Sequence, residues 1–99
     1  MDVEAALREL VDVLREERAA IRRLDGQAVT QAAEHKERLV GALSKAPREE
    51  LERAKERIAH VRAELRRNGT LLAHARDCLK TALEITRDAG GMKRLSTSV

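Results

Sequence analysis

The chain lacks aromatic residues altogether, and several other residue types are nearly absent. Its 99 residues contain no Phe, Trp or Tyr, a single Pro and a single Cys. Without aromatic side chains, a core is built from Leu, Val, Ile and Ala, which suit close-packed helices. A chain of this length forms one domain at most, and its core is thin because small domains bury less of their surface. The composition therefore predicts a small all-α domain.

Internal disulfide bonds and membrane spans are not expected. Cys78 is the only cysteine, so it has no partner within the chain. No apolar run approaches the roughly 18 to 20 residues that span a bilayer. Asp2 and Glu4 lie on an amphipathic pattern at the N-terminus, where a secretory signal would have a basic and then an apolar region. We therefore expect a cytoplasmic protein.

Positive charge is concentrated in the second half of the chain. The net charge is +3, with −2 over residues 1–50 and +5 over residues 51–99. Arg62, Arg66, Arg67 and the pair Lys93-Arg94 leave backbone contacts to a nucleic acid duplex as one alternative. The charges are nevertheless interleaved in sign, as on a solvated surface, and no aromatic residue is present to stack on a base. Nucleic acid is therefore not the partner we expect.

Apolar residues recur at steps of three and four, a pattern typical of amphipathic helices. The first helix is predicted over about residues 3–24, with Asp2 as its N-cap and Glu17 as the one break in its apolar stripe. Asp25-Gly26 predicts a turn in which Asp25 caps a second helix over about residues 27–45.

The third predicted helix, over residues 47–89, is about twice as long as each of the others. Pro47 suits its first turn, and Gly90-Gly91 are expected to end it. Its second half should extend beyond the hairpin formed by the first two helices. The predicted fold is an antiparallel helical hairpin packed on a long third helix, a three-helix bundle or coiled coil. Residues 1–91 would form a single domain, and residues 92–99 a flexible C-terminal tail.

Asn68-Gly69 is the one interior position where the third helix could break. Asn68 falls on the predicted buried stripe, where a polar residue commonly fixes register. Gly costs about 1 kcal/mol relative to Ala inside a helix, so a turn at Gly69 is the alternative. Such a turn would give four helices of similar length. We predict a continuous helix, since the heptad register is the same on both sides of Asn68-Gly69.

The apolar face of the third helix widens at Leu71. One position of the heptad repeat is occupied by Glu50, Arg57 and Glu64. From Leu71 onward, the same position is occupied by apolar residues. A wider face can contact two helices, and the predicted overhang provides no intramolecular partner for it. The candidate partner-binding residues share this face: Leu71, Leu72, Ala75, Cys78, Leu79, Ala82, Ile85, Thr86 and Met92.

The sequence predicts no catalytic residue, metal site or cofactor. His35 and His60 have no second His or Cys at the three- or four-residue spacing of a helical pair. His74 and Cys78 have that spacing but are too few for a closed zinc site. No glycine-rich phosphate loop or Ser-His-Asp arrangement stands out, so we do not expect an enzyme.

Several residues together resemble the FlgN-type flagellar export chaperones. They are Glu16-Glu17-Arg18, Asp25, Lys36 with Leu39 and Leu43, and Arg67-Asn68-Gly69 before Leu71-Leu72. The resemblance implies a three-helix cytosolic chaperone. Its clients would be C-terminal helices of the hook-filament junction proteins FlgK and FlgL, which it would hold until the flagellar type III secretion apparatus takes them. The alternatives are a structural coiled-coil module that forms a homo-oligomer and a basic nucleic-acid-binding protein.

Overall fold

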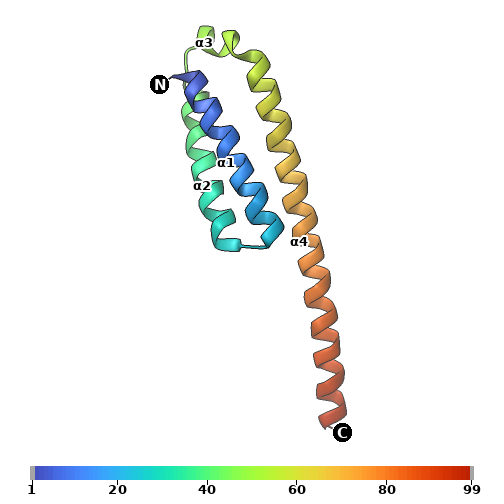
Figure 1. Ribbon diagram of the computed structural model, residues 1–99. Helices are drawn as coiled ribbons and strands as arrows, with labels where there is room; N and C mark the ends of the chain where they lie inside the picture. The colour runs from blue at the N-terminus through green and yellow to red at the C-terminus, as the bar shows by residue number, and fades with distance from the viewer. Residues whose placement is uncertain (1, 99) are drawn as a thin grey trace.

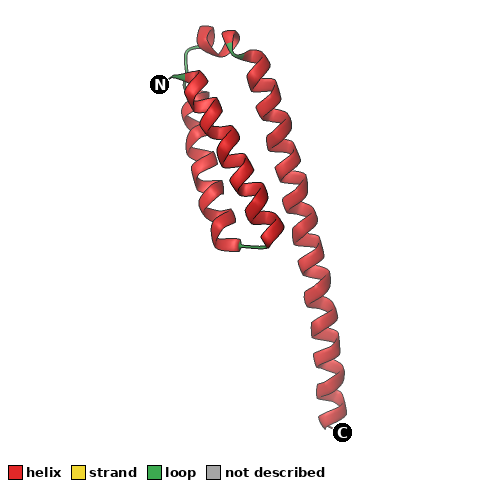
Figure 2. Ribbon diagram, in the orientation of Figure 1, coloured by secondary structure: helices red, strands yellow, loops and turns green. Residues whose placement is uncertain are grey.

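Helices account for nearly all of the described chain. The computed structural model describes the backbone of residues 2–98 and the side chains of residues 2–87. Its helices are α1 (Val3–Arg23), α2 (Gly26–Ser44), α3 (Arg48–Arg53) and α4 (Lys55–Ser98), joined by short turns (Figure 1, Figure 2). The described residues contain no strand, so the predicted all-α class is confirmed.

Helix α1 is the centre of the bundle. It forms an antiparallel hairpin with α2 and packs against α4, which runs parallel to it (Figure 1). Its stripe supplies most of the buried apolar side chains, whereas α2 buries only Ala32 and Leu39. The buried apolar residues of α1 are Val3, Ala6, Leu7, Leu10, Val13, Leu14, Ala20 and Ile21. The positions of α2 and α4 are therefore both set by their contacts with α1.

The predicted caps of the first two helices are present. The Asp2 carboxylate accepts a hydrogen bond from the Glu4 amide at 3.1 Å, and Asp25 accepts one from the Ala28 amide at 3.1 Å. Such caps satisfy amide groups that have no partner within the helix, and each contributes about 1 kcal/mol. Helix α1 ends at Arg23, and its C-cap residue Leu24 adopts a left-handed conformation with φ 56°.

The third predicted helix is divided at Ala54. Pro47 precedes the short helix α3, and Ala54 separates α3 from α4 with φ −101° and ψ 12°. Ala54 is itself buried, so the bend brings this part of the chain onto the core. No Pro or Gly lies at the bend, which explains why the sequence pattern did not indicate it.

Helix α4 runs without interruption through Asn68-Gly69, as predicted. The predicted end at Gly90-Gly91 differs from the structure, in which α4 continues to Ser98. The segment predicted as a tail, residues 92–99, is therefore helical as far as Ser98, and Val99 lies outside the described residues. Glycine lowers helix stability by about 1 kcal/mol per residue but does not prevent helix formation.

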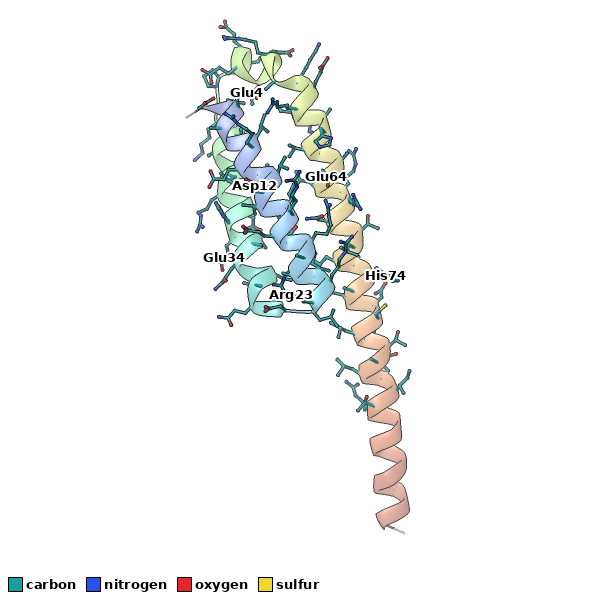
Figure 3. All side chains as sticks on the ribbon, in the orientation of Figure 1. Glu4, Asp12, Arg23, Glu34, Glu64 and His74 are labelled. Carbon is teal, nitrogen blue, oxygen red and sulfur yellow. The ribbon has the colours of Figure 1, made fainter. Side chains whose placement is uncertain are left out.

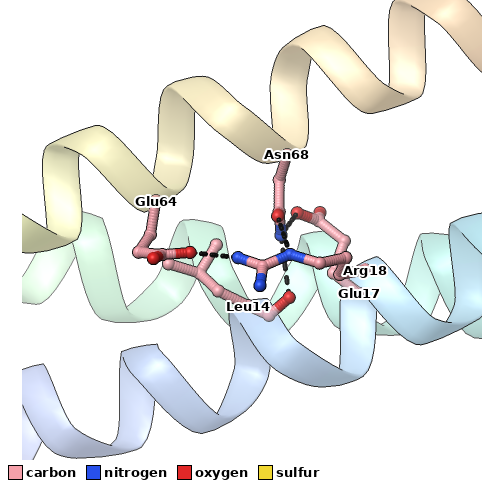
Figure 4. Close-up of polar contacts among 5 residues, drawn as sticks. All are labelled: Leu14, Glu17, Arg18, Glu64 and Asn68. Atoms are coloured by element: carbon pink, nitrogen blue, oxygen red, sulfur yellow. Dashed lines mark hydrogen bonds and ion pairs between the residues drawn. The ribbon is translucent and has the colours of Figure 1, made fainter.

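A buried polar cluster fixes α4 against α1 (Figure 4). Glu17 and Asn68 are 1% and 2% exposed. Asn68 Nδ2 donates to the Leu14 carbonyl oxygen at 2.8 Å and to Glu17 Oε1 at 3.0 Å. Arg18 Nε donates to Asn68 Oδ1 at 3.0 Å. The amide of Asn68 is therefore bonded on both its nitrogen and its oxygen to α1.

The same cluster extends to α2 and further along α4. Lys36 Nζ of α2 donates to Glu17 Oε2 at 2.9 Å. Arg18 also donates to the Glu64 carboxylate on α4 (Figure 4). Among the side chains that the structure describes, no buried polar atom is left without a hydrogen-bond partner. Because Glu17 is bonded from both α2 and α4, one carboxylate connects the three long helices.

Replacement of Asn68 by Ala should destabilise the bundle. It leaves Glu17 Oε1 and Arg18 Nε without their α4 partner, and losing such buried hydrogen bonds costs about 1–3 kcal/mol. Urea denaturation followed by circular dichroism measures this loss. The matched control is Thr70→Ala, which removes an exposed hydroxyl bonded only to the Arg66 carbonyl of the same helix. The control should change stability by less than about 0.5 kcal/mol. An Asn68 variant as stable as the control would contradict a role for the cluster.

The ion pair of Glu64 predicts a specific dependence of stability on pH. The hydrogen bond from Arg18 lowers the pKa of the Glu64 carboxyl below its ordinary value of 4.5. A carboxyl group whose pKa is lower in the folded state stabilises the fold above its unfolded pKa, and this contribution is lost as the pH falls through the folded value. Glu64→Gln should therefore lower the urea midpoint at neutral pH and have less effect well below pH 4.5. An equal loss at both pH values would contradict this assignment.

Candidate partner-binding surface

The second half of α4 extends beyond the end of the hairpin. His74 of α4 lies near the level of Arg23, the last residue of α1 (Figure 3). Ala75 is the last half-buried residue of α4 among the described side chains, and every described side chain from Arg76 to Arg87 is exposed. We refer to residues 76–87 as the free segment of α4. No other helix among the described residues covers it.

The predicted partner-binding residues divide into two groups along α4. Leu71, Leu72 and Ala75 are half-buried beside the end of the hairpin. The remaining residues with described side chains are exposed on the free segment: Cys78, Leu79, Ala82, Ile85 and Thr86. Met92 lies outside the residues whose side chains are described. The surface therefore begins at the edge of the core and continues onto an uncovered helix.

Leu83 belongs to the same surface, although the sequence pattern did not select it. Its side chain is 61% exposed, compared with 44% for Leu79 and 65% for Ile85. Leu83 follows Leu79 by four residues, which places the two side chains on neighbouring turns of one face. That spacing was visible in the sequence, but Leu83 lies outside the three heptad positions that defined the predicted face. The exposed apolar face is thus wider than predicted.

The polar groups on this surface bond mainly to their own helix. The Thr86 hydroxyl donates to the Ala82 carbonyl oxygen at 2.9 Å. Cys78 Sγ lies 3.7 Å from His74 Nε2, one turn away. Within the part of the chain that the structure describes, no three His, Cys, Asp or Glu side chains come together as a metal site. What the surface offers to a partner is apolar area with few directional groups.

None of the helices among the described residues is long and apolar enough to cross a membrane. Comparison with known proteins finds no matching family model, no matching curated protein and no matching solved structure. The arrangement of the chain's own residues is therefore the basis for inferring its function.

The exposed thiol of Cys78 reports whether the free segment is covered in solution. Cys78 is the only cysteine of the chain, and its side chain is exposed. We expect a maleimide to label it in the native protein at a rate close to that of the urea-unfolded chain, because thiol reactivity depends on access. A native rate far below the unfolded rate at every protein concentration would show that the thiol is not exposed as described.

Proposed function

We propose that the chain is a cytosolic chaperone resembling FlgN that holds an amphipathic helix of a client protein on the apolar face of α4. By the resemblance, the clients are the C-terminal helices of the hook-filament junction proteins, bound before their export by the flagellar type III secretion apparatus. The chain acts by binding alone, without catalysing a reaction. Helix-in-groove recognition of this kind needs an apolar face and anchor residues spaced by three, four or seven.

The observation that carries this proposal is the uncovered apolar face of the free segment. Leu79, Leu83 and Ile85 are among the few large hydrophobic side chains exposed in the described chain. Exposed apolar clusters of this kind are typical of protein interaction sites. A face that the chain leaves uncovered is available to the client without first unfolding the bundle.

The same face can supply the affinity that a chaperone needs. Burial of one Leu or Ile side chain contributes about 1.5–3 kcal/mol. Part of this free energy is offset by the lost motional freedom of the two partners. Because the face has few polar groups, it accepts different apolar sequences at matched helical spacing. Such tolerance suits a protein that holds two related clients.

A structural coiled-coil module is the second candidate, because the same apolar face could close a homo-oligomer. The two functions differ in how the chain behaves without a client. A chaperone is a monomer that forms a one-to-one complex with the client, whereas a structural module is an oligomer that is indifferent to clients. Light scattering during size-exclusion chromatography measures both masses.

Leu79→Asp combined with Ile85→Asp should abolish client binding. Both side chains are exposed, so the bundle should keep its wild-type helical content and urea midpoint. Loss of two buried apolar contacts corresponds to more than about a hundredfold weaker binding. Isothermal titration with the C-terminal helical segments of FlgK and FlgL from the same genome measures the effect.

The matched control for this variant is Thr70→Asp with Thr81→Asp, which adds the same charges on exposed positions of α4 away from the apolar face. It should bind with wild-type affinity. Unchanged affinity of the Leu79 and Ile85 variant would place the client elsewhere. Failure of the wild-type chain to bind either segment would refute the proposed function.

A further inference from the structure

An apolar groove lies between α2 and α4. Both helices pack against α1, but within the described chain they form no substantial interface with each other. Leu10 of α1 lies at the base of the groove, Val40 and Leu43 line the α2 side, and Ile58 and Leu65 line the α4 side. Val40 is 40% exposed. The three helices therefore leave an apolar groove open along one side of the bundle.

The apolar row on the α4 side of the groove continues onto the partner-binding surface. Ile58, Leu65, Leu72 and Leu79 follow one another at seven-residue spacing and so lie along one line of the helix. The first three are half-buried and Leu79 is exposed. The neighbouring row of the same stripe, three residues further along, packs against α1 and contains the buried residues Val61 and Asn68. One helix bound along this line would contact both the groove and the free segment.

Basic side chains border this row on one side, and we call them the basic edge. Arg48, Lys55, Arg62 and Arg66 line the outer side of the groove beside Ile58, together with one acidic residue, Glu52. All four are exposed, and none forms an ion pair with another residue of the described chain.

The basic edge continues along the free segment through Arg76, Lys80 and Arg87, which are also exposed and not ion-paired among the described residues. On the opposite side of α4, the basic residue Arg57 already has an acidic partner within the chain, since it pairs with Glu4 of α1 at 3.1 Å. Basic side chains therefore outnumber acidic ones along this edge, which makes it complementary to an acidic partner.

We propose that the groove binds an amphipathic helix of the partner that carries Asp and Glu along one edge of its apolar stripe. This helix would complete a four-helix bundle, with its acidic edge against the basic edge of α3 and α4. The inference rests on the proposed function, since it identifies the client helix by its charge and extends its binding site. A second copy fits less well, because an antiparallel pair of α4 helices would set one basic edge against another.

Two synthetic amphipathic peptides test this proposal. They share one Leu-rich stripe, and one peptide has Glu along the edge where the other has Lys. Fluorescence anisotropy with the full chain should show about tenfold tighter binding of the Glu peptide, because several exposed ion pairs each change affinity only a few-fold. The difference should shrink at high salt. Equal affinity for the two peptides, or no binding of either, would overturn the proposal.

Variants locate the peptide on the surface. Arg62→Glu with Arg66→Glu should reduce the preference for the Glu peptide, whereas Arg22→Glu with Arg38→Glu makes the same charge change on α1 and α2 and should preserve it. Val40→Asp should weaken binding of both peptides while the urea midpoint stays near wild type. Wild-type peptide affinity in the Val40 variant would overturn the proposal.

The outcomes separate the groove from the proposed function. If Leu79→Asp with Ile85→Asp abolishes binding and Val40→Asp does not, the function of the free segment stands and the groove proposal fails. The reverse result supports the groove and refutes the free segment as the binding site. Binding of duplex DNA that needs Arg62 and Arg66 but not Val40 would overturn the proposal in favour of nucleic acid. A dimer that Val40→Asp dissociates would overturn it in favour of a second copy.

Discussion

The buried bonds between Glu17 and Asn68 set the register of the whole molecule. A shift of α4 by one turn, about 5.4 Å, would leave both side chains buried without each other. Loss of one partner from such a pair costs several kcal/mol, because the remaining polar group stays out of water. The hydrogen bonds of Asn68 therefore determine which α4 residues lie beside the core and which extend past Arg23. The free segment and the groove both follow from this one alignment.

The features that the sequence predicted well depend on residues close together along the chain. Asp2 and Asp25 cap helices whose amides lie two or three residues away, so a short pattern was sufficient to identify them. Continuity through Asn68-Gly69 followed from a heptad register that extends on both sides. Exposure of Leu79 and Ile85 followed from the unequal lengths of the predicted helices, because a longer helix extends past its shorter neighbours.

The features that the sequence did not predict depend on contacts between distant residues. Glu17 interrupts an apolar stripe, and its role became clear only from Lys36 and Asn68, which lie 19 and 51 residues away. The basic edge could be recognised only once the side of α4 that faces α1 was known. The bend at Ala54 depends on how the chain crosses from α2 to α4, and no residue type marks it. In each case the missing information was the packing of whole helices.

The position of the free segment divides α4 into a part that stabilises the bundle and a part that the bundle does not need. Residues 55–75 of α4 hold the core, while residues 76–87 extend beyond it. In most small domains a binding site shares side chains with the core, so a change in specificity also costs stability. Here, the side chains on the uncovered turns are exposed and add little to the packing of the bundle. Their sequence can therefore change through many single steps without passing through unstable intermediates.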